Sequence, residues 1–189
     1  MGRHGNGASV WDIAHTLRVS IGSVILVWAS KDEKIKSKAW VLARSGIPEW
    51  QNGFVMVDGT LVPLQFTLQL EGHFDRKKNY SLNVQLVILL HNLKIIEYMV
   101  GSPGSTHDSS AFARSDIFAN PHHYLAKGEW IWADLGYRLL EHIVSPYRHS
   151  ASLASEDFKQ FNKALSNVRI RSEHAIGYLK GCFQALKGI

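Results

Sequence analysis

The spacing of apolar residues changes once along the chain, near residue 45, and predicts two unlike regions. From Ser9 to about Ala43 the apolar positions recur at helical spacing. The segment SGIP at residues 45–48 interrupts this pattern, because Gly and Pro both end regular helices. We therefore predict a partial helix-turn-helix-like region over residues 1–45 and a separate domain over residues 46–189.

Beyond residue 46 the apolar positions first alternate, as in β-strands, and then return to helical spacing. The predicted strands are Gly53–Leu70 with an interruption at Pro63, Tyr80–His91, Lys94–Val100, Glu129–Ala133 and His142–Ser145. The predicted helices are Asp108–Phe118 and Ser155–Phe183. This order of elements is that of a ribonuclease-H-like α/β fold, although periodicity alone predicts only a mixed sheet flanked by helices.

Composition limits the kinds of binding partner and the cellular compartment that we expect for this chain. The formal net charge of +5 favours a polyanionic partner, although a mild excess of Lys and Arg on a solvated surface would give the same value. Cys182 is the only cysteine, so neither a disulfide framework nor a cysteine zinc site can form, as expected in a reducing intracellular compartment. No stretch of the sequence reaches the roughly 18 apolar residues of a membrane span.

Three acidic residues lie in strongly patterned segments. Asp58 follows the apolar run FVMV, Asp134 follows WIWA, and Glu173 lies in the last predicted helix. Carboxylates buried close together are costly unless a cation compensates their charge, so the set indicates a divalent-metal site. Simpler interpretations remain for each: both aspartates could open turns at strand ends. Glu173 could pair with Arg169, four positions earlier, on a solvated helix face.

Other polar residues could support such a site or bind its substrate. Asp108 could be a fourth carboxylate, but we favour a role as a helix cap or as support behind the metal ligands. Six basic residues could meet DNA phosphates, or could remain solvated charges: Arg76, Lys77, Lys78, Arg169, Arg171 and Lys180. The segment WDIAHTLRVSIGSV has the spacing of a helix-turn-helix, yet its second helix offers few side chains that read base edges. A purely structural helical pair is therefore an open alternative there.

Several motifs occur together and in a fixed order: VDGT (57–60), FDRKKNYSLNVQ (74–85), GSPGSTHDSSAFARS (101–115), ADLGY (133–137), SPYR (145–148) and NVRIRSEHAIGYLKGCF (167–183). In this order they resemble the DDE superfamily endonucleases of the PIF/Harbinger transposase type, which include ALP1-like proteins and Harbinger-derived nucleases. The resemblance covers roughly residues 47–187.

The resemblance implies a ribonuclease-H-like fold in which Asp58, Asp134 and Glu173 form a DDE triad. Such a triad binds two Mg²⁺ or Mn²⁺ ions and cleaves DNA phosphodiester bonds. Asp134 is preferred to Asp108 as the second acid because it follows the fourth strand, and Glu173 follows it by 39 positions. Cys182 departs from the family pattern, which has a basic residue there, and this puts one phosphate contact in doubt.

The resemblance also implies partners and a location. DNA is the expected substrate, a Myb-like protein the expected helper, and the nucleus the expected location, with the cytoplasm and homo-oligomerisation left open. We expect the domain over residues 46–189 to be truncated at its C-terminal end relative to the family. The alternative function is a catalytically inactive, domesticated transposase that binds DNA or assembles complexes in the nucleus. A ribonuclease-H-like enzyme acting on RNA or hybrids is disfavoured by the transposase motifs.

Overall fold

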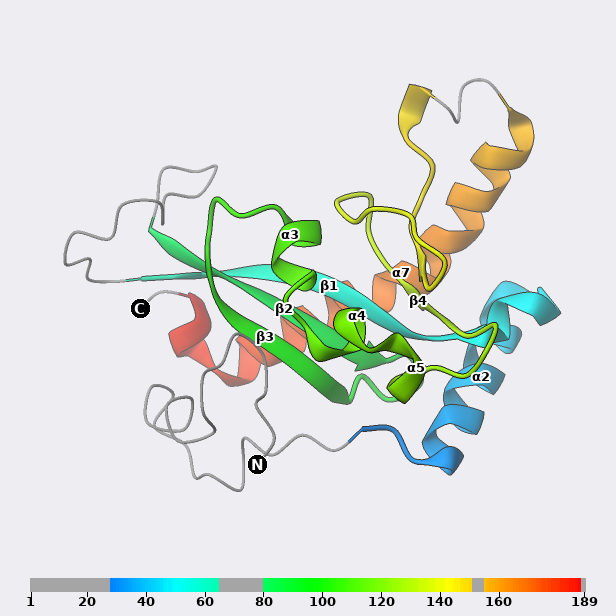
Figure 1. The fold of residues 1–189 in the computed structure, drawn as a ribbon, viewed down its shortest axis with the longest axis horizontal. Coiled ribbons are helices and arrows are strands. Elements are labelled where there is room, and N and C mark those ends of the chain that lie inside the picture. The colour runs from blue at the N-terminus through cyan, green and yellow to red at the C-terminus, as the bar shows by residue number, and fades with distance from the viewer. Residues whose placement is uncertain (1–27, 65–79, 151–154, 188–189) are drawn as a thin grey trace.

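A five-stranded sheet forms the centre of the molecule (Figure 1). The computed structural model describes residues 28–64, 80–150 and 155–187. The strands are β1 (Gly53–Pro63), β2 (Ser81–Leu89), β3 (Ile95–Pro103), β4 (Trp130–Trp132) and β5 (Ile143–Val144). Their order in the sheet is β3-β2-β1-β4-β5, in which β1, β2 and β3 are antiparallel neighbours and β4 and β5 continue in parallel from β1. The predicted ribonuclease-H-like mixed sheet is thereby confirmed.

Helices cover both faces of this sheet. The helical elements are α2 (Lys31–Ser45), η2 (Pro48–Asn52), α3 (Asp108–Phe112), α4 (Asp116–Ala119), α5 (Pro121–Tyr124), α7 (Glu156–Cys182) and η3 (Gln184–Lys187). In Figure 1, α3, α4 and α5 lie in front of the sheet and the long helix α7 runs behind it. Among the described residues, no helix is both long enough and apolar enough to cross a membrane.

Two hydrophobic cores follow from the alternation of side chains along β1. Val55 and Val57 are fully buried and pack toward α3 and α4, with Phe112 and Ile117. Met56 lies on the opposite face, in the core that α7 closes with Val168. Burying each such side chain contributes about 1.5–3 kcal/mol. The sheet is therefore held between two layers, and each face of β1 has a fixed neighbour.

A buried serine connects helix α2 to the sheet through hydrogen bonds. The Ser37 hydroxyl donates to the carbonyl of Phe54 at 2.6 Å and accepts from the amide of Leu90 at 3.1 Å. The helix ends at Gly46, which has a φ of 70° and donates its N–H to the carbonyl of Leu42 at 2.9 Å. The predicted stop is confirmed, while the division of the chain into two domains at residue 45 stays a prediction.

One alternative interpretation and one prediction about element boundaries are wrong. Asp58 does not end its strand or open a turn, because β1 continues to Pro63 and pairs with β2 throughout. The predicted helix over 108–118 is two short helices, since the Ser115 side chain accepts from the amide of Phe118 at 3.1 Å and starts α4 anew. The predicted helix-turn-helix and the basic residues Arg76, Lys77 and Lys78 lie outside the described residues.

Candidate active site

Asp58 and Asp134 are brought together by the parallel pairing of β1 and β4. Met56 pairs with Trp132, and each acid lies two residues further along its strand direction. Side chains of a strand alternate between faces, so both acids share the face of Met56. That face is the one that α7 covers. The sheet therefore directs two carboxylates toward one helix.

The Asp58 carboxyl is half-buried. Burial raises its pKa above the ordinary 3.8, and the negative charge of Asp134 raises it further. Three neighbours lower this pKa: the Ser172 hydroxyl, the Gly59 N–H at 2.8 Å and the charge of Arg169. Burial has the largest influence on this pKa, so the hydrogen bonds and the Arg169 charge do not fully offset the cost of a buried negative charge. A cation placed beside the carboxylate would lower its free energy.

Asp134 already has a cationic partner. Arg169 on α7 donates from Nη2 to Asp134 Oδ1 at 2.6 Å, and the amide of Leu135 donates to the same oxygen at 2.6 Å. The Asp134 side chain is 40 % exposed and that of Arg169 is 23 % exposed, so the pair lies at the surface of the site. A positive charge is thus attracted to the acids even in the absence of a metal.

Glu173 lies apart from these two acids. It is Ser172, the preceding residue, that is buried and faces Asp58; its hydroxyl also lies 2.9 Å from the carbonyl of Arg169. Glu173 is exposed and lines a cavity of about 280 Å³ on the α2 side of α7. The two aspartates of the expected triad therefore lie close together, and the glutamate is the residue after the serine that faces Asp58.

Asp108 belongs to the opposite face of the sheet. Its Oδ1 accepts hydrogen bonds from Asn83 Nδ2 at 3.0 Å and Gln85 Nε2 at 2.9 Å. A Cβ atom at Gly59 would lie only 2.4 Å from that oxygen, so glycine is needed where β1 passes beneath Asp108. His107, not Asp108, occupies the N-cap position of α3, and no side chain caps that helix. The predicted capping role is wrong.

Tyr137 is buried where it feels the charges of Asp108 and of the two acids on the other face. Its hydroxyl donates to Gln85 Oε1, and burial raises the pKa of the phenol well above its usual range. The charges of Asp108, Asp58 and Asp134 raise this pKa further. Sequence reasoning missed Gln85 and Tyr137. Polar positions in the otherwise apolar strand SLNVQLVIL, and the tyrosine that ends ADLGY, were the available signals.

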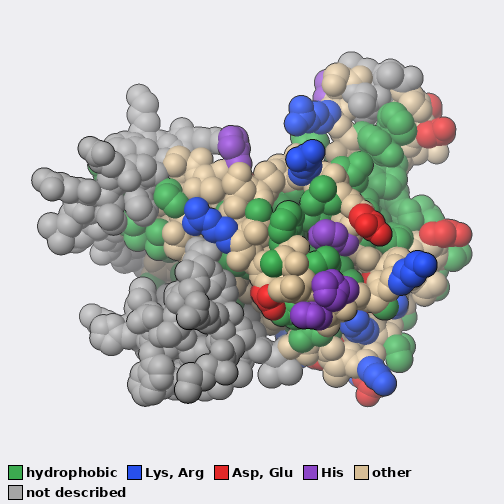
Figure 2. Space-filling view, in the orientation of Figure 1, with side chains coloured by type: hydrophobic (Ala, Val, Ile, Leu, Met, Phe, Trp, Pro, Cys, Tyr) green, Lys and Arg blue, Asp and Glu red, His purple; other side chains and the backbone are tan. Residues whose placement is uncertain are grey.

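The basic residues named from the sequence have different surroundings. Arg171 donates from Nε to the carbonyl of Leu90 at 2.8 Å and from Nη2 to that of His91 at 2.9 Å. Lys180 donates to the carbonyl of Leu61 at 2.8 Å. Lys and Arg side chains are scattered over the face drawn in Figure 2 and do not gather in one patch there. Of these basic residues, Arg169 is the one that lies beside the acids within the part of the chain that the structure describes.

The donor set fits a divalent cation of the hard, oxygen-seeking kind. Mg²⁺ is commonly held by one or two carboxylates together with water and substrate phosphates. Asp58 and Asp134 supply two carboxylates on one face, and the Arg169 charge stands where a cation is favoured. Within residues 28–64, 80–150 and 155–187, no group of three or more His, Cys, Asp or Glu side chains is arranged to hold a metal ion. The fit therefore rests on the two aspartates.

Comparison with known families agrees with this geometry. The chain matches the family model of the DDE superfamily endonucleases over residues 57–189, a range that contains all four acids discussed above. A comparison with curated protein sequences gives no significant match. Nucleases of this superfamily act on DNA and generally use divalent metals, in keeping with a pair of carboxylates beside the sheet. The chain belongs to the DDE superfamily endonucleases.

Proposed function

We propose that the chain is a metal-dependent DNA endonuclease of the PIF/Harbinger transposase type, with Asp58, Asp134 and Glu173 as the ligands of two divalent cations. The observation that carries the proposal is the register of β1 and β4, which aligns the two aspartates on the face of α7. Asp58 lies on β1 and Asp134 lies two residues beyond the end of β4. Placement at paired strands suits metal ligation, because the ligands need little reorganisation when the ion binds.

The residues around the acids have distinct proposed tasks. When bound, divalent cations activate water and stabilise the leaving 3′ oxygen of the phosphodiester. Asp58 and Asp134 hold the charge needed for this, and the Ser172 hydroxyl orients Asp58. The hydrogen bonds from Asn83 and Gln85 fix Asp108 behind the sheet, where it supports the position of β1.

Glu173 needs a movement of its side chain to join the two aspartates. It lies four residues after Arg169, whose side chain contacts Asp134, and residues at this spacing share one face of a helix. The helix itself is held in place by its buried residues, Leu165, Val168, Ser172 and Ala175. We propose that metal and DNA together favour a turn of the Glu173 side chain toward Asp134, since three carboxylates gather only around positive charge.

A second candidate function is supported by the same site. The Arg169–Asp134 ion pair and the outward direction of Glu173 also suit a domesticated transposase that no longer cleaves DNA. Such a protein would bind DNA or assemble complexes in the nucleus. For either function we propose a nuclear location, with the cytoplasm left open, and a Myb-like helper protein and self-association as further partners.

Cleavage of supercoiled plasmid in Mg²⁺ or Mn²⁺ tests the proposal. The wild-type chain should nick or linearise the plasmid, and Asp58→Asn should lower the rate by at least about 100-fold, because a ligand charge is lost. Asp116→Asn, on the other face of the sheet, is the matched control and should cleave like the wild type. Metal binding without any cleavage by the wild type would favour the inactive alternative.

A further inference from the structure

Arg169 lies between Asp134 and a cavity beside α7. On one side its Nη2 contacts Asp134 Oδ1 at 2.6 Å. On the other side it lines the cavity that also contains Glu173. Its Nε is buried and finds no hydrogen-bond partner among the described residues. A guanidinium carries five N–H donors in a planar fork, so Arg169 has donors left for a second acceptor.

The cavity beside Arg169 has the chemistry of an anion site. It has a volume of about 280 Å³ and is formed by the C-terminal end of α2 and the middle of α7. The lining residues are Arg44, Ser166, Asn167, Arg169, Ile170 and Glu173. Arg44 donates from Nε to the carbonyl of Asn167 at 3.4 Å, a long contact that holds it weakly. Two guanidinium groups and one exposed carboxylate line the cavity, and the charge of Arg169 is shared with Asp134 while that ion pair lasts.

The cavity is large enough to admit a phosphate of a DNA backbone, and Arg44 and Arg169 offer it donors. Arginine pairs with phosphate through two parallel N–H donors, which Lys cannot do. A phosphate in the cavity would attract Arg169 and repel Glu173. Both effects favour the metal-binding arrangement, because Asp134 would lose its cationic partner and Glu173 would be driven out of the cavity.

We propose that this cavity is a phosphate subsite for the DNA backbone and that Arg169 exchanges between Asp134 and the bound phosphate. In the DNA-free protein Arg169 holds the place of a cation at Asp134 and competes with the metal. DNA in the cavity withdraws Arg169 and frees the carboxylate. Metal binding and DNA binding are then coupled, and by linkage each strengthens the other by the same factor. This inference rests on the proposed metal-dependent function.

Calorimetric titration with Ca²⁺, in the presence and absence of a short DNA duplex, tests the exchange. The Ca²⁺ affinity of the wild type should rise by about tenfold when the duplex is present, which is an ordinary coupling. Arg169→Gln should bind Ca²⁺ more tightly than the wild type without DNA, and should lose most of the coupling. Arg169→Lys keeps the positive charge beside Asp134, so the Ca²⁺ affinity of this variant should stay low without DNA. A lysine cannot pair with a phosphate through two parallel donors, so the coupling between Ca²⁺ and DNA binding should fall.

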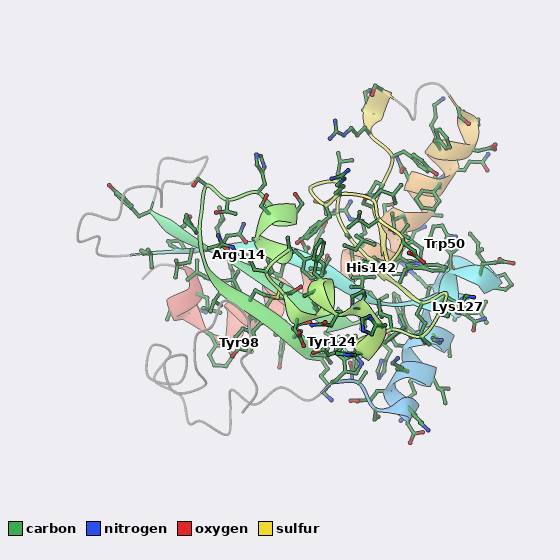
Figure 3. All side chains as sticks on the ribbon, viewed as in Figure 1. Trp50, Tyr98, Arg114, Tyr124, Lys127 and His142 are labelled. Carbon is green, nitrogen blue, oxygen red and sulfur yellow. The ribbon has the colours of Figure 1, made fainter. Side chains whose placement is uncertain are left out.

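The matched control is Arg114→Gln, which removes the same charge from the exposed turn between α3 and α4 (Figure 3). It should leave both the Ca²⁺ affinity and the coupling unchanged. Thermal melting of each variant confirms that it is folded before titration. Ca²⁺ binding that depends on Asp58 but is the same in Arg169→Gln and the wild type would overturn the exchange alone. Absence of Ca²⁺ binding in the wild type, with and without DNA, would overturn the proposed function itself.

Discussion

Two pairs of carboxylates lie on opposite faces of the same sheet, and they are stabilised in different ways. Asp58 and Asp134 face α7 and have Arg169 beside them. Glu97 on β3 faces α4, and its Oε1 accepts the amides of Asp116 at 3.2 Å and Ile117 at 3.5 Å. Burial raises the pKa of the Glu97 carboxyl to about 7, and the charge of Asp116 adds to this, although the amides oppose it.

The second pair is surrounded by neutral donors. Asp116 accepts from Asn120 Nδ2 at 2.8 Å and from the hydroxyl of Tyr124 on α5, which Figure 3 labels. Burial raises the pKa of the Tyr124 phenol, so this donor stays protonated. Proximity of acids alone therefore does not indicate a metal site. The distinguishing features of the first pair are the Arg169 guanidinium that contacts Asp134 and the adjacent cavity.

The largest expected effect is on DNA cleavage, and it distinguishes Asp134 from Asp108, which lie on opposite faces of the sheet. Asp134→Asn should abolish metal-dependent DNA cleavage, because it removes the charge of a direct ligand. Asp108→Asn should leave a measurable fraction of the activity, since its carboxylate accepts from Asn83 and Gln85 behind the sheet. Initial rates on plasmid DNA at saturating Mn²⁺ decide between them. The reverse ranking would mean that Asp108 and not Asp134 is the second ligand.

Metal should stabilise the first pair and leave the second unaffected. At a Mg²⁺ concentration 100 times the dissociation constant, the free energy of unfolding should rise by about 2.7 kcal/mol. The folded-state pKa of Asp58 is raised, so its ionisation costs stability as pH rises from 3.8 through the folded value. Metal relieves this cost, and the stabilisation should therefore be larger at pH 7.5 than at low pH.

Thermal melts with and without Mg²⁺ measure this effect. Asp58→Asn should lose the metal-induced shift and, without metal, should be more stable than the wild type at pH 7.5. An equal shift in Asp58→Asn and the wild type would show that the ion binds elsewhere.

Removing the buried charge of the second pair should stabilise the protein. The folded-state pKa of Glu97 is about 7, against an ordinary 4.5, so its ionisation penalty develops between these values and is complete above them. Glu97→Gln should gain on the order of 2 kcal/mol at pH 8 relative to the wild type, with little difference at pH 4. Urea unfolding at the two pH values checks it. A difference independent of pH would mean that Glu97 does not carry the penalty.

The smallest effect concerns two arginines, Arg171 on α7 and Arg44 at the end of α2. Arg171 lies over the Trp40 ring and donates to the carbonyls of Leu90 and His91, so its guanidinium holds the β2–β3 turn. Arg171→Ala should cost about 1.5 kcal/mol of stability and leave the salt dependence of DNA affinity unchanged. Arg44→Ala should instead shallow the log–log salt slope by about 0.9. Equal slopes for both variants would remove the distinction between structural and DNA-facing arginines.

The succession of strands along the chain could be predicted because it depends on local pattern. Apolar runs precede Asp58 and Asp134, but their proximity depends on the parallel pairing of β1 with β4, which local pattern does not give. The choice of Glu173 came from the family resemblance and not from the pattern of the helix. The buried residues of α7, Leu165, Val168, Ser172 and Ala175, recur at helical spacing and place Ser172, one residue earlier, on the face toward the sheet. Ser115 was overlooked as a helix start because the apolar spacing of residues 108–118 continues across it.

The roles of Arg169 and Arg171 were likewise beyond the sequence. Both are arginines on one helix, two positions apart, and the sequence assigns both to phosphates. Their surroundings differ because residues two apart on a helix face different directions, one toward Asp134 and the other toward the carbonyls after β2. Only the tertiary arrangement of the sheet and α7 separates them.

The most direct test of the contrast between the two carboxylate pairs is a crystal grown with Mn²⁺ and measured for anomalous scattering. The account predicts a strong anomalous peak between Asp58 and Asp134, with the Arg169 side chain moved away from Asp134, and no peak between Glu97 and Asp116. A peak at Glu97 and Asp116 alone, or none beside Asp58 at saturating Mn²⁺, would contradict it.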